Sequence, residues 1–134
     1  MNKAACAYGK ACNPSGVTQG LCPKGWHLPT HAEYGTLYTA IGGTGIAGTK
    51  LKSTRGWSNS GNGTDNYEFS VLPAGYRYDI GDFVSQGHDA DLWSAFENNR
   101  YYAWDENFGY SYANVSRDII YHKDYAFSVR CVKD

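Results

Sequence analysis

A helical repeat of apolar residues stands out near the start of the chain. The apolar positions follow the spacing i, i+3, i+4, i+7, which aligns them on one face of a helix: Tyr34, Leu37, Tyr38 and Ile41. Thr30 and Glu33 match the T-x-x-E capping box that closes the N-terminus of a helix. Gly42 and Gly43 follow the stripe, and glycine typically ends a helix. The pattern predicts one helix over about residues 31–41.

The rest of the chain favours short strands and long loops. Residues 42–63 are rich in Gly, Ser, Thr and Asn, so they have room for only a short helical turn at 47–52, with Leu51 and Trp57 as apolar anchors. Near the C-terminus, apolar and polar residues alternate with the two-residue period of a half-buried strand. We expect strands at five places: 69–72, 92–96, 102–108, 114–117 and 126–132. This arrangement predicts an α+β domain.

Length and composition limit the class of protein. The 134 residues suffice for a single domain, in which residues 1–21 are predicted to form an irregular arm. A net charge of -1, from 12 basic and 13 acidic residues, argues against a nucleic-acid partner, because such a partner requires a basic surface. No apolar segment reaches the roughly 18–20 residues of a membrane span, so we expect no direct membrane insertion.

Four cysteines bear on the cellular compartment: Cys6, Cys12, Cys22 and Cys131. They show no CxxC spacing, and the histidines do not interleave with them as zinc ligands would. Two disulfides and an oxidising compartment are therefore favoured over free thiols. The residues after Met1 lack the apolar core of an export signal. We expect the leader and neighbouring domains of an exported parent protein to lie outside this sequence, with Met1 an added start.

Five segments, taken in order, resemble the blocks of the Fibrobacter succinogenes major paralogous domain: CPKGWHLPTHAEY (22–34), AGTKLKSTRGW (47–57), GNGTDNYEFSVLPAGYR (61–77), LWSAFE (92–97) and FSVRCVKD (127–134). The match covers about residues 20–134. The family is similar in layout to C-type-lectin-like domains, which implies adjacent termini, an early helix, small antiparallel sheets and long Gly-rich loops. Members occur in exported and surface proteins of Bacteroidota-like bacteria, and the resemblance implies no enzymatic activity.

The family blocks also suggest how the cysteines pair. Cys22 and Cys131 lie in blocks at opposite ends of the match, and Cys6 and Cys12 lie close together in the arm. We predict the disulfides Cys22–Cys131 and Cys6–Cys12. The first would close a loop of more than 100 residues, which the chain-entropy estimate values at roughly 4–5 kcal/mol.

The stretch 98–125 departs most from the family pattern. Members often carry Asn-rich filler there, whereas this chain carries tyrosines and charged residues. The contrast resembles the variable region of proteins diversified by retroelements that mutate adenines in Asn-type codons. Tyr supplies large, rigid contact area with a polar tip, as in antibody paratopes. The predicted ligand-binding residues are Asn99, Arg100, Tyr101, Tyr102, Asp105, Asn107, Tyr112, Asp118, Ile119, Tyr121, His122 and Tyr125. The alternative is that these are ordinary residues of a tyrosine-rich sheet.

Other chemistries are less well supported by the sequence. The segments ENN (97–99) and WDEN (104–107) share residue types with the calcium ligands of sugar-binding lectins, but the order within WDEN differs, so calcium is a possible cofactor and no metal ligand is assigned. Asp105 and Glu106 are neighbours on a predicted strand and point to opposite faces, which does not suit a glycosidase. No nucleophile-elbow motif surrounds Ser94, the candidate partner of His88 and Asp91. We predict no enzyme and no catalytic residue.

The sequence thus predicts a recognition domain of an exported bacterial surface protein or pilus. Its partner would be a protein or glycan on another cell surface, contacted by one contiguous surface over residues 100–125. A carbohydrate-binding module of polysaccharide-degrading machinery and a purely structural module are the alternatives. Trp26, Trp57, Trp93 and Trp104 are interpreted as core. Trp104 and Arg117 are expected to be buried, and Tyr101 and Tyr121 exposed.

Overall fold

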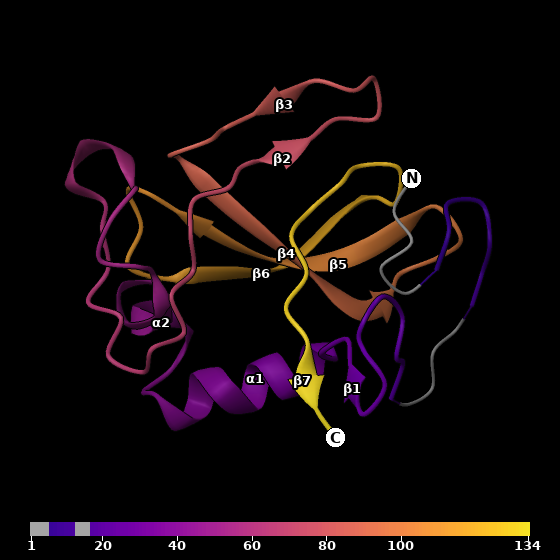
Figure 1. Cartoon of the computed structure of the whole chain (residues 1–134), viewed down its shortest axis with the longest axis horizontal. Helices are drawn as coiled ribbons and strands as arrows, with labels where there is room; N and C mark the ends of the chain where they lie inside the picture. The colour runs from indigo at the N-terminus through magenta and orange to yellow at the C-terminus, as the bar shows by residue number, and fades with distance from the viewer. Residues whose placement is uncertain (1–5, 13–16) are drawn as a thin grey trace.

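The computed structural model describes residues 6–12 and 17–134, apart from the side chains of Asp118 and Ile119. After the short strand β1 (Trp26–His27), the chain forms two helices, α1 (His31–Ala40) and α2 (Thr44–Leu51), followed by a 3₁₀ turn at Ser58–Ser60. The other strands are β2 (Tyr76–Arg77), β3 (Phe83–Val84), β4 (Asp89–Glu97), β5 (Tyr102–Gly109), β6 (Val115–His122) and β7 (Val132–Lys133). The helices lie on one side of the central sheet and the β2–β3 hairpin on the other (Figure 1). The predicted α+β class is confirmed.

The predicted capping box starts α1. The Thr30 hydroxyl accepts a hydrogen bond from the Glu33 backbone N–H at 3.1 Å, and the Glu33 carboxylate accepts one from the Thr30 N–H at 2.8 Å. The chain then turns away through Gly42, whose φ of 108° favours glycine. Tyr34 and Tyr38 are buried, as the helical period predicts.

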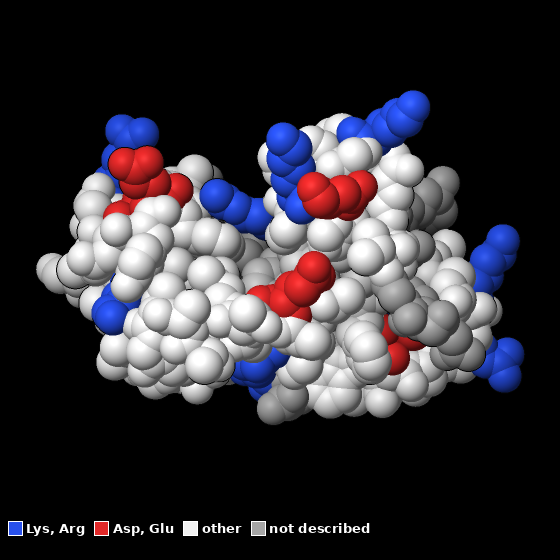
Figure 2. Space-filling view, turned by 90° about the horizontal axis from the view of Figure 1, so that it is seen from below, with Lys and Arg blue, Asp and Glu red and all other residues white. Residues whose placement is uncertain are grey.

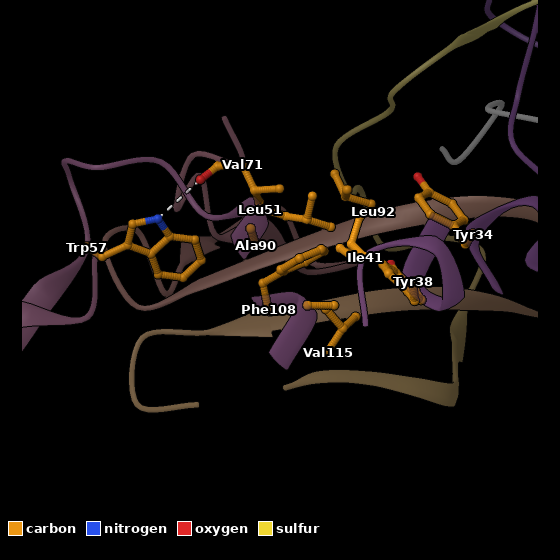
Figure 3. Close-up of a cluster of buried hydrophobic side chains, with 11 residues drawn as sticks. Tyr34, Tyr38, Ile41, Leu51, Trp57, Val71, Ala90, Leu92, Phe108 and Val115 are labelled. Carbon is orange, nitrogen blue, oxygen red and sulfur yellow. Dashed lines mark hydrogen bonds between the residues drawn. The ribbon is translucent and has the colours of Figure 1, made fainter. Parts of the chain in front are cut away.

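The central sheet is antiparallel, in the order β4-β5-β6, and a cluster of buried side chains packs on each of its faces. Ala90 and Leu92 of β4 join Phe108 of β5 in a cluster that packs against the two helices (Figure 3). The alternate residues Trp93 and Ala95 join a second cluster on the opposite face. A strand covered on both sides cannot show the simple alternation of apolar and polar residues.

Two small sheets complete the fold. β1 pairs with β7, so the segment before α1 lies beside the C-terminal segment (Figure 1). The disulfide Cys22–Cys131 joins the same two segments, and a second disulfide links Cys6 to Cys12. Both predicted pairings are confirmed, and together they indicate an oxidising compartment. Among the described residues, the structure contains no helix with the length and apolar character needed to cross a membrane.

Two predicted strands are wrong and one is too short. Residues 69–72 form a single bridge, Val71 to Lys52, because Glu68 and Ser70 have positive φ angles that interrupt an extended chain. In residues 126–132, Phe127 is buried and Arg130 is exposed, as the alternation predicts. Before β7, however, only isolated residues of this segment form backbone bridges. The strand expected at 114–117 continues to residue 122 as β6.

Gly48 lets α2 approach the turn before β6. A Cβ atom at Gly48 would lie 2.5 Å from the carbonyl oxygen of Asn114, whereas a Cβ at Gly45 on the same helix would meet open space. We expect Gly48→Ala to lower the free energy of unfolding by about 1–3 kcal/mol through overpacking. Gly45→Ala, the matched control, should be neutral or stabilising by up to about 1 kcal/mol. Urea unfolding of both variants measures this; equal effects would contradict the packing at Gly48.

Candidate functional site

The β5–β6 hairpin separates the predicted ligand-binding residues into two groups. Tyr102 pairs with His122 at one end of the hairpin, and Phe108 pairs with Val115 at the other. A rise of about 3.3 Å per residue places these ends roughly 20 Å apart. Tyr112 lies in the turn at the far end, beside Gly109. The predicted surface over residues 100–125 is therefore divided between the two ends of the sheet, and its role in binding stays a prediction.

At the near end, rings from four parts of the chain touch one another in a series. Tyr8 lies 5.3 Å from Tyr101 and 6.2 Å from His122, measured between ring centroids. His122 contacts Tyr102 at 4.3 Å and Tyr125 at 6.3 Å, and Tyr125 contacts Tyr78 at 5.4 Å. We call these residues the aromatic row: Tyr8, Tyr101, Tyr102, His122, Tyr125 and Tyr78.

The aromatic row is accessible to a partner. Tyr8 is 43% exposed and Tyr101 is 40% exposed, while the other members are half-buried. The guanidinium of Arg100, an exposed residue, lies 5.3 Å from the Tyr101 ring centroid. Asn99 shapes the turn that presents them, since its side-chain oxygen accepts hydrogen bonds from the N–H groups of Tyr101 and Tyr102 at 2.8 and 3.1 Å.

The N-terminal arm supplies Tyr8, which the sequence analysis did not include. The Gly9 N–H donates to the Arg100 carbonyl at 2.9 Å, and the Cys12 N–H donates to the Glu97 carboxylate at 2.7 Å. The Lys123 ammonium donates to the Lys10 carbonyl at 3.1 Å and forms an ion pair with Glu97, with both side chains nearly fully buried. The Cys6–Cys12 loop is therefore fastened to the sheet at several points. The short cysteine spacing around Tyr8 was the available sequence signal.

Asp105 and Asn107 do not lie on this surface. Asp105 is completely buried, and Asn107 donates from its amide to Asp91 at 2.8 Å. Because Asp105 is charged, the sequence predicts that it lies at the surface. In the structure, however, the second core cluster covers the face of the sheet to which Asp105 points. Its neighbour Glu106 is also completely buried, on the other face, so the prediction that the two carboxylates point apart is confirmed.

Tyr121 is only partly exposed, so its predicted exposure is only partly confirmed. Its ring lies 5.0 Å from Phe127 in the second core cluster and 5.7 Å from Tyr125. Burial, followed by the charges of Asp91 and Asp105, raises the pKa of Tyr121 to about 12. Tyr121 therefore supports the aromatic row from behind. The side chains of Asp118 and Ile119 are outside the described residues.

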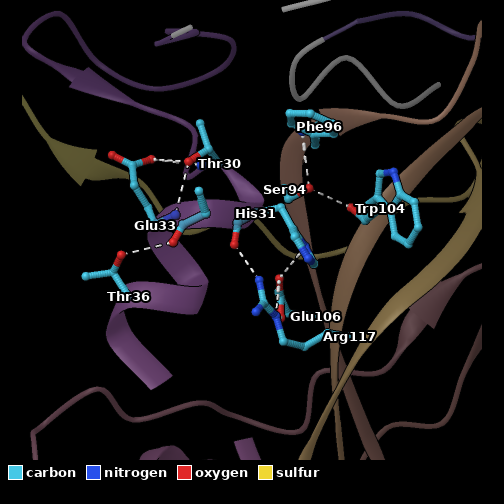
Figure 4. A network of polar contacts seen from close by, with 10 residues as sticks. Thr30, His31, Glu33, Thr36, Ser94, Phe96, Trp104, Glu106 and Arg117 are labelled. Atoms are coloured by element: carbon cyan, nitrogen blue, oxygen red, sulfur yellow. Dashed lines mark hydrogen bonds and ion pairs between the residues drawn. The ribbon is translucent and has the colours of Figure 1, made fainter. Parts of the chain in front are cut away.

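Arg117 anchors β6 to α1 instead of serving as a contact residue (Figure 4). Its Nε lies 3.1 Å from Oε2 of the buried Glu106, and its Nη2 donates to the His31 carbonyl. Its side chain is 18% exposed, which confirms the structural role. The Trp104 ring contacts the His31 ring at a tilt, with centroids 5.8 Å apart, and Trp104 is half-buried, not buried as predicted. Of the four tryptophans, Trp57 and Trp93 are core residues, whereas Trp26 is 40% exposed.

The residues considered for catalysis and calcium have other partners. The Ser94 hydroxyl donates to the Trp104 carbonyl at 3.1 Å, and His88 packs its ring against Tyr110, so neither contacts the other. The carboxylate of Glu97, in the ENN segment, forms an ion pair with Lys123 and accepts a hydrogen bond from the Cys12 N–H. A cavity of about 280 Å³ lies away from the aromatic row, between α1 and the C-terminal segment that includes Val132. The molecular face seen in Figure 2 carries scattered charges of both signs around a hollow.

The comparisons with known proteins identify a family and leave its activity open. A family model described as the Fibrobacter succinogenes major domain matches residues 3–133, nearly the whole chain. Searches of the curated proteins and of the solved structures returned no match. The chain therefore belongs to the Fibrobacter succinogenes major domain family.

Proposed function

We propose that this domain is the ligand-binding part of an exported bacterial surface protein and that it contacts its ligand through the aromatic row. The ligand would be a protein on another cell surface. The observation that carries the proposal is the series of ring contacts from Tyr8 to Tyr78, joined on its outer side by the exposed Arg100. Tyr and Arg are the residue types that contribute most to binding energy at interfaces.

The scaffold holds the aromatic row in place before a ligand arrives. The arm that carries Tyr8 is closed by a disulfide and is bonded to Arg100 and Glu97. A preorganised surface loses little conformational entropy on binding, so more of the contact energy appears as affinity. This rigidity distinguishes the aromatic row from exposed tyrosines on a mobile loop.

A C-type-lectin-like fold is part of the same proposal. Three features support it: an early helix, chain ends joined through β1, β7 and Cys22–Cys131, and a long irregular stretch between α2 and β4. In such a layout, loops held by a rigid sheet carry the binding residues. Diversification of the surface by a retroelement is a further part of the proposal. It predicts sister copies that differ mainly at positions of the aromatic row such as Tyr101, Tyr102 and Tyr125.

The test compares two sets of tyrosines in a cell-binding assay. Fluorescent domain is applied to a panel of bacterial and animal cells, with and without protease treatment. We expect binding that protease abolishes and that the triple variant Tyr8→Ser, Tyr101→Ser and Tyr102→Ser loses. Tyr121 is left unchanged, because its ring packs against Phe127 in the core. The control Tyr67→Ser with Tyr112→Ser changes exposed tyrosines outside the aromatic row and should bind normally.

The remaining outcomes identify the alternatives. The exposed rings of Tyr8 and Tyr101 also suit the stacking of sugar rings, which favours the carbohydrate-binding module as second candidate. In that case periodate treatment of the cells abolishes binding and protease does not. Binding that survives the triple variant but disappears with EDTA would contradict the aromatic row and indicate a calcium-dependent sugar pocket. The melting temperature of the control should stay close to wild type, because exposed substitutions usually change stability by less than about 0.5 kcal/mol each. That of the triple variant should fall only slightly, because Tyr102 is the one half-buried residue among its three.

A further inference from the structure

Two carboxyl groups are buried side by side behind the aromatic row. Asp91 of β4 is 1% exposed and Asp105 of β5 is 0% exposed. Asp91 is the cross-strand partner of Asn107, and Asp105 is the partner of Trp93, so the two aspartates are diagonal neighbours on one face of the sheet. Their carboxyl groups lie within hydrogen-bonding reach of each other.

The hydrogen bonds of this pair are incomplete unless a proton is present. Asn107 donates to Oδ1 of Asp91 at 2.8 Å. Oδ2 of Asp91 and both carboxyl oxygens of Asp105 receive no hydrogen bond from any part of the chain that the structure describes. Two ionised carboxylates in this position would repel each other and lack solvation. One proton removes the conflict, because a protonated Asp105 donates its O–H to Asp91.

The charged surroundings favour that proton. Asp89 on β4 and Glu106 on the opposite face of β5 add negative charge, and Tyr121 on β6 is neutral. Among the described residues, no lysine or arginine is a main contributor to the raised pKa of either carboxyl group. Burial first, and then the charge of Asp91, raises the pKa of Asp105 far above its ordinary range. Burial also raises the pKa of Asp91, less strongly because Asn107 stabilises its charge.

We propose that Asp91 and Asp105 form a proton-binding site, and that release of their shared proton loosens the packing behind the aromatic row. On release, the O–H bond of Asp105 breaks, the proton passes to solvent, and two adjacent carboxylates remain. Tyr121 connects the pair to the aromatic row, because both aspartates act on its pKa and its ring lies 5.7 Å from Tyr125. The effect on ligand binding rests on the proposed function, but the proton site itself does not.

The direction of the pH dependence follows from the raised pKa values. The folded state holds this proton more tightly than the unfolded chain, so stability falls as the pH rises above the ordinary carboxyl pKa of about 4. His27 acts in the same direction over part of the range, because hydrogen bonds to Asp134 and Glu33 raise its pKa. The contribution of His27 to stability is fully present below about pH 6.5 and is lost as the pH rises through the raised pKa of His27. The pH dependence of wild-type stability alone therefore does not identify Asp91 and Asp105 as the proton-binding site.

Two measurements on the free protein test the proposal. The first is the melting temperature between about pH 5 and about pH 9. Wild type and the control Asp82→Asn, which changes an exposed residue, should both melt at lower temperature as the pH rises. The melting temperature of Asp105→Asn should depend much less on pH, because the amide of the new side chain donates a hydrogen bond to Asp91 at every pH. An unchanged pH dependence in Asp105→Asn would overturn the proposal.

The second measurement needs no variant and therefore remains informative if Asp105→Asn does not fold. Carbon-13 NMR of Asp-labelled wild type follows each carboxyl group through the same pH range. We expect one group to titrate well above its ordinary range together with amide shifts along β4–β6 and at Tyr121. Titration of every carboxyl near pH 4 would overturn the proposal. Loss of the high titration on adding millimolar Ca²⁺ would also overturn it, since the pair would then hold a cation.

Discussion

Replacing Cys22 and Cys131 together by alanine is expected to lower the free energy of unfolding by about 4–5 kcal/mol. The disulfide closes a loop with a sequence separation of 109 residues, and the chain-entropy estimate grows with loop length. A loss of this size approaches the total stability of many domains, so the variant should be partly unfolded at ambient temperature. Urea unfolding followed by circular dichroism measures the change.

The Cys6–Cys12 disulfide provides the matched control. Its separation of six residues gives a smaller chain-entropy estimate, about 2 kcal/mol. Its removal should leave the sheet intact, as judged by an unchanged far-UV circular dichroism spectrum, while releasing the arm that carries Tyr8. Equal losses from the two double variants would contradict the view that Cys22–Cys131 holds the two ends of the fold together.

Arg117→Met should be the most damaging single change outside the disulfides. It removes the cation that faces Glu106, a carboxylate with no exposed surface. Breaking a buried ion pair from one side typically costs about 3–5 kcal/mol, because a buried charge loses its partner. His31, which lies 3.2 Å from Glu106, remains beside the carboxylate in this variant. Urea unfolding of wild type and of Arg117→Met measures the loss.

Two further variants separate the ion pair from the side-chain volume. Adding Glu106→Gln to Arg117→Met removes the buried charge and should recover part of the lost stability. Arg55→Met, at an exposed arginine, should be close to neutral and serves as the control. Additive losses in the double variant would show that Arg117 acts through packing on Tyr38, whose ring centroid lies 5.3 Å from its guanidinium carbon.

Local signals made α1 and the disulfides predictable. The helix begins at a capping box formed by residues three positions apart, and its buried stripe repeats within a few residues. β4 and β5 were also recognisable, because their apolar residues are concentrated in short segments. Each of these features depends on neighbours in the sequence or on family blocks.

The composition of the binding surface was only partly predictable, for two physical reasons. Asp105 is charged and alternates with apolar residues, a pattern that usually indicates a strand face exposed to solvent. Here the second core cluster covers the face of the sheet on which Asp105 lies. Tyr8 reaches the surface through backbone bonds from Gly9 and Cys12 to residues 100 and 97. A backbone N–H leaves no trace in the sequence, so contacts of this kind between distant segments cannot be read from it.

Photocrosslinking from defined positions tests the central claim most directly. The photoreactive residue p-benzoylphenylalanine is placed at Tyr101 in one variant and at Tyr67 in another. Both positions are exposed tyrosines, and only Tyr101 belongs to the aromatic row. After the domain has bound protease-sensitive cells and has been irradiated, the account predicts a crosslinked cell-surface protein from position 101 and none from position 67. Crosslinking from position 67 with none from position 101 would contradict it.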